Sequence, residues 1–189
     1  MRILFIGDIT GKSGRDVVSS LLLSLKSEYE IDLVIANGEN SAHGKGITWK
    51  IYSQFMSDGI DYITLGNHAF SKSEILSYTG ETDRLIFPYN HCKRTNEAYF
   101  KVITFHEIRF VLTNILGEAF MNETSTDPFT AFEEVMKKGD LYDPDFYFVD
   151  FHGETTAEKR TFAEYFHNKA KVVVGTHTHV QTADEDMIH

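Results

Sequence analysis

The sequence is poor in cysteine, proline and basic charge, and each shortage excludes a class of protein. Cys92 is the only cysteine among 189 residues, so no intrachain disulfide can form and we expect a reducing, cytoplasmic setting. Only three prolines and no repeated or low-complexity segment interrupt the chain, which predicts a single domain over residues 1–189. Lys and Arg number 18 against 28 Asp and Glu, a net charge of −10, so we expect no binding of duplex DNA.

Long hydrophobic runs are missing too. The longest, at residues 3–7 and 172–175, are far shorter than the ~20 residues that cross a bilayer. The N-terminus has no basic stretch leading into an apolar segment with a cleavage site. We therefore expect neither a membrane span nor a signal peptide.

Five short β-rich runs are each followed directly by polar residues. Such runs, with little alternation, are typical of strands buried on both faces, and ligands of open α/β sheets collect at the carboxyl ends of strands. The pattern predicts an α/β sandwich in which helices flank a central mixed sheet, with a functional site at one sheet edge. The runs are 3–7, 33–36, 62–66, 146–149 and 172–175.

Helix signals lie between these runs. Residues 15–30 have apolar side chains at helical spacing, and we expect the stripe from Leu21 to Leu25 in the core. Capping-box spacing predicts helix starts at Ser71 and at Thr155. Asp127-Pro128 predicts a further start, and Gly139 the end of that helix.

Three further expectations concern a strand pair, a helix face and the remaining histidines. Residues 98–115 read as two strands joined by a turn near His106. The spacing of Trp49, Tyr52 and Phe55 places them on one helix face, as core residues. The histidines outside the five polar clusters are expected at the surface or in loops: His43, His91, His106, His167 and His189.

The polar clusters offer carboxylate, amide and imidazole donors. Mixed oxygen and nitrogen donors favour manganese, iron or zinc over calcium or magnesium. There are more donors than one ion needs, whereas two ions ~3.5–4 Å apart that share a carboxylate would use them. The candidates are Asp8, Glu39, Asn40, Asn67, His68, His152, His177 and His179. His177 and His179 alternate, so they would share one face of a strand.

These clusters resemble the five motifs of calcineurin-like metallophosphoesterases. The resemblance is closest to the YmdB-like branch, bacterial 2',3'-cyclic-nucleotide phosphodiesterases, and residues 37–47 and 175–185 are its most specific parts. The motifs are Gly7-Asp8, Asn37-Gly38-Glu39-Asn40, Gly66-Asn67-His68, Phe151-His152 and Gly175-Thr176-His177-Thr178-His179.

The resemblance implies a role for each residue. It places one ion on Asp8, Glu39, Asn40 and His179. It places the second on Glu39, Asn67, His152 and His177, so Glu39 would bridge two ions, iron or manganese. Hydroxide held between them would attack the phosphorus of a small phosphodiester, and His68 would protonate the leaving oxygen.

The chain departs from the family pattern in several places. Thr10 stands where most of these enzymes have a ligand histidine; the branch shares this change and uses Asn40 instead. Ala69-Phe70 replaces the branch's Thr-Trp, which removes a group that would orient His68. The branch also continues beyond the segment matching His189, so we expect a C-terminally truncated form or self-association as a homo-oligomer through an open sheet edge.

Two alternatives stay open at this point. The same site would also serve a phosphomonoesterase or nucleotidase, because the substrate pocket rather than the metal site separates these activities. A non-catalytic regulator that binds a nucleotide or a metal is the other, supported by Ala69-Phe70 and the early stop at His189. Asp150, two residues before His152, is expected on the alternate face of the chain, where it would pack or orient its loop.

Overall fold

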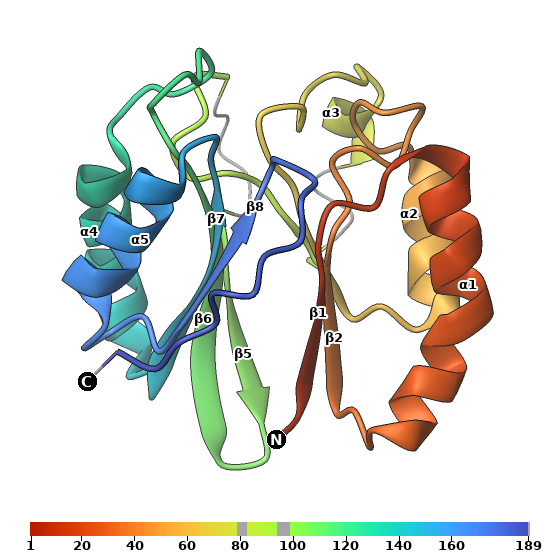
Figure 1. The fold of residues 1–189 in the computed structure, drawn as a ribbon, viewed down its shortest axis with the longest axis horizontal. Coiled ribbons are helices and arrows are strands. Elements are labelled where there is room, and N and C mark those ends of the chain that lie inside the picture. Colours follow the sequence, from red (N-terminus) through yellow and green to blue (C-terminus); the bar gives the residue numbers. More distant parts are fainter. Residues whose placement is uncertain (79–82, 94–98, 189) are drawn as a thin grey trace. The chain divides into compact units, whose positions relative to one another are not determined.

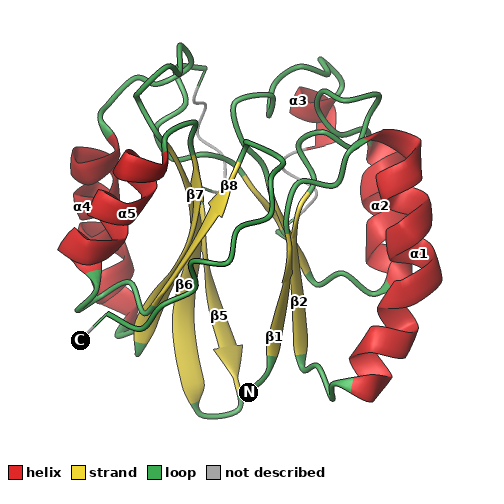
Figure 2. Cartoon of the chain, in the orientation of Figure 1, coloured by secondary structure: helices red, strands yellow, loops and turns green. Residues whose placement is uncertain are grey.

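The computed structural model describes residues 1–78, 83–93 and 99–188. The chain forms two compact units: unit 1 holds the described residues up to Phe87, and unit 2 the described residues from Pro88 on. Each unit contains one four-stranded sheet with helices beside it (Figures 1 and 2). The α/β class is confirmed. The expected central sheet is replaced by two sheets, because the strands of the second half pair only among themselves.

The sheet of unit 1 is parallel throughout. Its strands pair in chain order: β1 (Ile3–Ile6), β2 (Leu33–Asn37), β3 (Tyr62–Thr64) and β4 (Leu85–Ile86). Every residue of β2 is buried, as predicted, but β1 is only half-buried, since it is an edge strand with one neighbour. All these strands point their carboxyl ends toward the same edge of the sheet.

Helices α1 (Gly11–Glu28), α2 (Trp49–Asp58) and α3 (Ile75–Tyr78) complete unit 1 (Figure 1). The apolar stripe of α1 was predicted correctly only in part. Leu22 is buried, whereas Leu21 is 49% exposed, because the buried face runs through Val18 and Leu22. On α2, Tyr52 and Phe55 are buried as expected, whereas Trp49 is exposed.

The helix start predicted at Ser71 is wrong. Residues 71–74 form bends and turns, and α3 begins only at Ile75. Glu74, the expected capping partner, instead accepts a hydrogen bond from the backbone N–H of Trp49 at 2.9 Å. A tertiary contact with the first turn of α2 therefore replaces the local cap.

The sheet of unit 2 is mixed. β5 (Phe100–Phe105) and β6 (Ile108–Leu116) form the predicted antiparallel pair, and β7 (Phe146–His152) and β8 (Val172–Thr176) follow in parallel. β8 is an edge strand and is mostly half-buried, so here too the prediction of a strand buried on both faces is wrong.

Helices α4 (Pro128–Gly139) and α5 (Thr156–Phe166) lie side by side on one face of this sheet (Figure 1). Phe162 of α5 packs against Phe151 of β7, with ring centroids 4.7 Å apart. Asp127 and Thr155 cap the two helices as predicted, by accepting backbone N–H groups of the first turns.

Gly139 ends α4 for a reason other than the predicted one. Its backbone stays right-handed, and the chain continues into a short 3-10 helix, η2 (Asp140–Tyr142). A Cβ at this position would lie 2.6 Å from the hydroxyl oxygen of Tyr147. The glycine is therefore required by close packing and not by a left-handed turn.

The remaining expectations concern two histidines and the absence of a membrane span. His91 lies in a loop, as the prediction allowed, but it is buried there at 2% exposure, and its Nδ1 accepts the backbone N–H of Lys93. His189 lies outside the described residues. None of the helices in the described part of the chain combines the length and the hydrophobicity needed to cross a membrane.

Candidate metal centre

The loop after β2 places a buried carboxylate at the sheet edge of unit 1. Asn37 shapes this loop: its side-chain amide donates to the carbonyl of Leu65 at 2.9 Å, and its side-chain oxygen accepts the N–H of Glu39 at 3.1 Å. Gly38 is required because a Cβ there would lie 2.8 Å from Ile63. Glu39 is 1% exposed, although an ionised carboxylate is costly to bury unless partners compensate its charge.

Two other loops of unit 1 meet the loop that carries Glu39. After β3, the backbone N–H of His68 donates to the Glu39 carboxylate at 2.9 Å. After β1, Ile9 and Gly11 donate backbone hydrogen bonds to the carbonyls of Asn37 and Asn40, at 3.0 and 2.9 Å. The strand order thus gathers three of the predicted motifs at one edge.

The other unit 1 candidates lie in these same loops. Asp8, between β1 and Ile9, is half-buried, as are Asn67 and His68 in the turn after β3. Asn40 is 4% exposed, and its side-chain amide donates to the carbonyl of Gly44 at 2.9 Å. The loops that meet at the buried glutamate therefore also carry these carboxylate and amide side chains.

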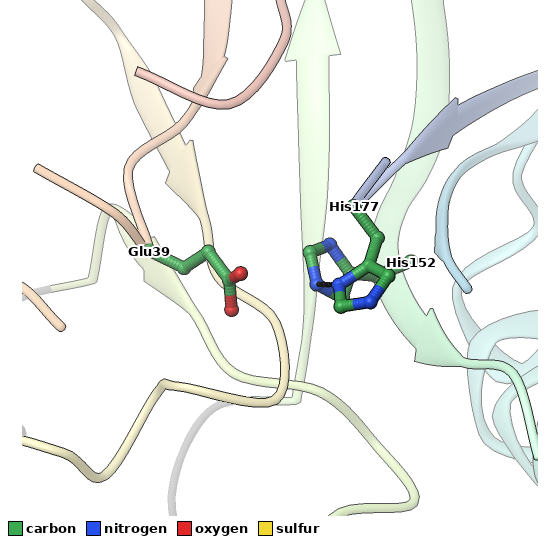
Figure 3. A group of neighbouring side chains, drawn as sticks. All are labelled: Glu39, His152 and His177. Carbon is green, nitrogen blue, oxygen red and sulfur yellow. Dashed lines mark hydrogen bonds between the residues drawn. The ribbon is translucent and has the colours of Figure 1, made fainter. Parts of the chain in front are cut away.

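Unit 2 holds a pair of imidazoles. His152 is the last residue of β7 and fully buried, and His177 follows β8 directly. Nδ1 of His177 lies 3.1 Å from Nε2 of His152, as the dashed line in Figure 3 marks; the figure also draws Glu39 of unit 1. Parallel pairing of β7 with β8 sets His152 opposite Thr176, and this places His177 next to it.

The outer nitrogens of both imidazoles are held as well. Nδ1 of His152 lies 2.9 Å from the hydroxyl of Thr176, which donates to the carboxylate of Asp150 at 2.6 Å. Nε2 of His177 lies 3.1 Å from the carboxylate of Glu154. Each ring therefore turns one nitrogen toward an acid, directly or through a hydroxyl, and the other toward its partner ring.

This arrangement fits two ligands of one cation. Two nitrogens bound about 2.1 Å from an ion, at a right angle, lie about 3.0 Å apart, and the observed separation is 3.1 Å. Histidine ligands commonly direct their second nitrogen to a carboxylate or hydroxyl group. The imidazole pair of unit 2 is therefore suited to bind a transition-metal ion, and imidazole donors favour zinc or iron.

The prediction that His177 and His179 share a strand face is wrong. β8 ends at Thr176, and both histidines have left-handed backbone, with φ of 99° and 54°. Non-glycine residues with positive φ cost energy and cluster at functional sites. The turn gives His177 its direction toward His152, and it leaves the side chain of His179 exposed.

Sequence reasoning missed Thr176 and Glu154 and left Asp150 without a definite role. The prediction that Asp150 lies on the alternate face from His152 is wrong, because residues two apart on β7 share one face of the sheet. Thr176 lies within the motif at residues 175–179, but the pattern predicts metal donors only, and a threonine hydroxyl is not one of them. Glu154 lies in a loop, and the sequence does not show which way that carboxylate points.

Comparison with known proteins gives consistent matches along the whole chain. The family described as "YmdB-like protein" matches residues 4–189. A Bacillus subtilis (strain 168) protein named 2',3'-cyclic-nucleotide 2'-phosphodiesterase is 39% identical over 188 residues, which cover 100% of this chain and 70% of that protein.

Two solved structures share the fold closely. One is a hypothetical protein from Thermus thermophilus, 35% identical with a TM-score of 0.88; the match covers 97% of this chain and 70% of that one. The other is described as a novel phosphatase from Mycoplasma pneumoniae, 37% identical with a TM-score of 0.87, over 96% of this chain. Of the Mycoplasma chain, 66% is covered, just under two thirds of its length.

Proposed function

Because the chain belongs to the YmdB-like protein family, we propose that it is a metal-dependent phosphodiesterase that hydrolyses 2',3'-cyclic nucleotides or related small phosphodiesters. The observation that carries this proposal is the pair of imidazole nitrogens at 3.1 Å, each ring anchored at its other nitrogen by an acid or a hydroxyl. The name of the Bacillus subtilis relative supports the substrate class.

In this proposal both units act as one metallophosphoesterase domain. One ion would be held by Asp8, Glu39, Asn40 and His179, and the other by Glu39, Asn67, His152 and His177. When bound, two such ions supply positive charge beside the phosphoryl oxygens and lower the pKa of water. Iron and manganese suit this mixed set of donors.

The proposed proton donor to the leaving oxygen is His68. Its backbone N–H donates to the carboxylate of Glu39, a proposed metal ligand, and this hydrogen bond supports a role for His68 beside the ions. The ribose oxygen that leaves from a cyclic phosphodiester is a poor leaving group until it gains a proton. A half-buried imidazole at this point can donate that proton as a general acid.

The test is a hydrolysis assay on the chain with added Mn²⁺ or Fe²⁺. We expect turnover of 2',3'-cyclic nucleotides and of bis-p-nitrophenyl phosphate. His152→Ala should abolish both, whereas the control His167→Ala should not, because the ring of His167 bonds to the carbonyl of Glu164 at the end of α5. Absence of turnover with either metal would contradict the proposal.

The same assay separates the alternatives. Faster hydrolysis of 2'- or 3'-nucleotide monoesters than of cyclic diesters would show a phosphomonoesterase, an activity consistent with the phosphatase named from Mycoplasma pneumoniae. Nucleotide or metal binding without turnover would show a regulator. Cys92 is an exposed free thiol, which is consistent with the reducing cytoplasm, where we propose that the enzyme acts.

A further inference from the structure

A buried carboxylate next to the imidazole pair has no role in the reaction described so far. Asp150 lies on β7 and is 0% exposed, although burying an ionised carboxylate costs several kcal/mol unless hydrogen bonds compensate it. Its side chain accepts the Thr176 hydroxyl at 2.6 Å, within the range of strong hydrogen bonds to a charged acceptor. The strand end is held too, because Asn114 of β6 donates its side-chain amide to the Asp150 carbonyl at 3.0 Å.

The direction of these hydrogen bonds determines which nitrogen His152 presents. An ionised carboxylate only accepts, so the single proton of the Thr176 hydroxyl is committed to Asp150. The hydroxyl oxygen, 2.9 Å from His152, must then accept from Nδ1–H of that ring. In the neutral ring this leaves the lone pair on Nε2, the nitrogen that faces His177.

We propose that Asp150 and Thr176 are positioning residues for the metal, a buried relay that fixes His152 as an Nε2 ligand. The inference rests on the proposed metal site but not on the identity of the substrate. His177 is held in a complementary way, with Nε2 toward Glu154 and Nδ1 toward His152. The two supports differ in strength, because the side chain of Glu154 is 48% exposed whereas Asp150 and Thr176 are buried.

The variants follow from the atoms involved. Thr176→Val keeps the shape of the side chain but removes the hydroxyl from the relay, and Thr176→Ser restores it. The control is Thr113→Val on β6, since Thr113 is also fully buried and its hydroxyl donates one hydrogen bond, to the carbonyl of Tyr99 at 3.0 Å. Both valine variants lose a buried hydroxyl, but only one of these hydroxyls contacts a proposed ligand.

Zinc alone is the probe, with its affinity measured by competition against a chromophoric chelator. Loss of a hydrogen-bonding partner behind a metal ligand typically weakens binding 10–100-fold. We expect a loss of that size for Thr176→Val, recovery to within about 3-fold for Thr176→Ser, and an unchanged affinity for Thr113→Val. In the zinc-loaded wild-type chain, ¹⁵N NMR should show His152 with its proton on Nδ1 and the metal on Nε2.

Each result has one meaning. Wild-type zinc affinity in Thr176→Val, or a proton on Nε2 of His152 in the zinc-loaded wild type, overturns the relay even if that variant folds poorly. An equal loss in Thr113→Val overturns it too, because the effect would then be general destabilisation. If the relay results hold but no phosphodiester is hydrolysed, the proposed function fails and the positioning role stands. If the wild type binds no zinc, the relay fails, whereas the proposed function is judged separately by turnover with Mn²⁺ or Fe²⁺.

Discussion

Glu39→Gln should have opposite effects on stability with and without metal. Glutamine keeps the size of the side chain and an oxygen that can accept the His68 N–H, but it removes the charge. At 1% exposure that charge is a cost to the metal-free chain. We therefore expect the metal-free variant to be at least as stable as the wild type. With metal present, the same charge becomes favourable.

The magnitude follows from the binding equilibrium. An ion that binds only the folded chain, at 100 times its Kd, raises the free energy of unfolding by about 2.7 kcal/mol. Residues behind a metal ligand are worth 10–100-fold in affinity, so loss of the charged ligand itself should cost about 100-fold or more. The same metal concentration then equals the Kd, and only about 0.4 kcal/mol of stabilisation is left. The Mn²⁺-dependent stabilisation should thus fall by about 2.3 kcal/mol.

The assay is urea unfolding of chelator-treated protein, with and without added Mn²⁺. Glu107→Gln is the matched control, because it makes the same charge change at an exposed position in the turn between β5 and β6. If Glu39→Gln keeps the full Mn²⁺ effect, Glu39 is not a ligand. If it loses more than about 2 kcal/mol without metal, the carboxylate is a structural group, and the reasoning from buried charge is refuted.

Three further predictions concern catalysis, packing and capping. His68→Ala should still bind Mn²⁺, but its rate of cyclic-nucleotide hydrolysis should fall about 10²–10⁴-fold. The rate on bis-p-nitrophenyl phosphate should fall far less, because that leaving group needs no proton. Equal losses on both substrates would contradict the general-acid role. Gly139→Ala should lower the free energy of unfolding, measured in urea, by about 1 kcal/mol. Overpacking against Tyr147 costs about 1–3 kcal/mol, which exceeds the ~1 kcal/mol gain in helix propensity. A stabilised variant would show that Tyr147 moves aside freely. Asp127→Ala should cost about 0.5–2 kcal/mol at pH 7 as a lost helix cap. Hydrogen bonding from the backbone N–H of Thr130 lowers the pKa of Asp127 below its ordinary value of 3.8. The difference in free energy of unfolding between wild type and variant should therefore be complete above pH 3.8 and shrink as the pH falls through the lowered pKa. The same difference in urea curves at pH 7 and at about pH 3 would contradict this.

Elements defined by local chemistry could be predicted from the sequence. The five apolar runs became strands, because they are short, rich in β-branched and aromatic residues, and followed by polar residues. Asp127 and Thr155 cap helices through hydrogen bonds to residues two or three positions away, which the sequence shows directly. The hairpin turn at His106 also depends only on neighbouring residues.

Predictions failed where the outcome depends on distant parts of the chain. Ser71 and Glu74 have the spacing of a cap, but Glu74 bonds to Trp49, 25 residues away. Leu21 has helical spacing yet is exposed, since the buried face of α1 is narrower than its apolar stripe. No local pattern contains these contacts.

The candidate site divides along the same line. The sequence shows the donor types and their positions directly after strands, so the seven proposed metal ligands and His68 could be named from it. These assignments remain predictions for experiment. The network behind them was not, because Asp150, Thr176 and His152 meet only through pairing of β7 with β8. Self-association through an open sheet edge also stays a prediction.

In both sheets the strands lie side by side in the order in which they occur along the chain. During synthesis each new strand can therefore dock onto the strand made just before it, and none has to be inserted between two that are already paired. β8 is the last strand of its sheet, and His177 is the next residue. The imidazole pair thus forms only when β8 docks onto β7. A nascent chain still short of this point would have β5, β6 and β7 but no imidazole pair, so metal capture by this pair would report that β8 has docked.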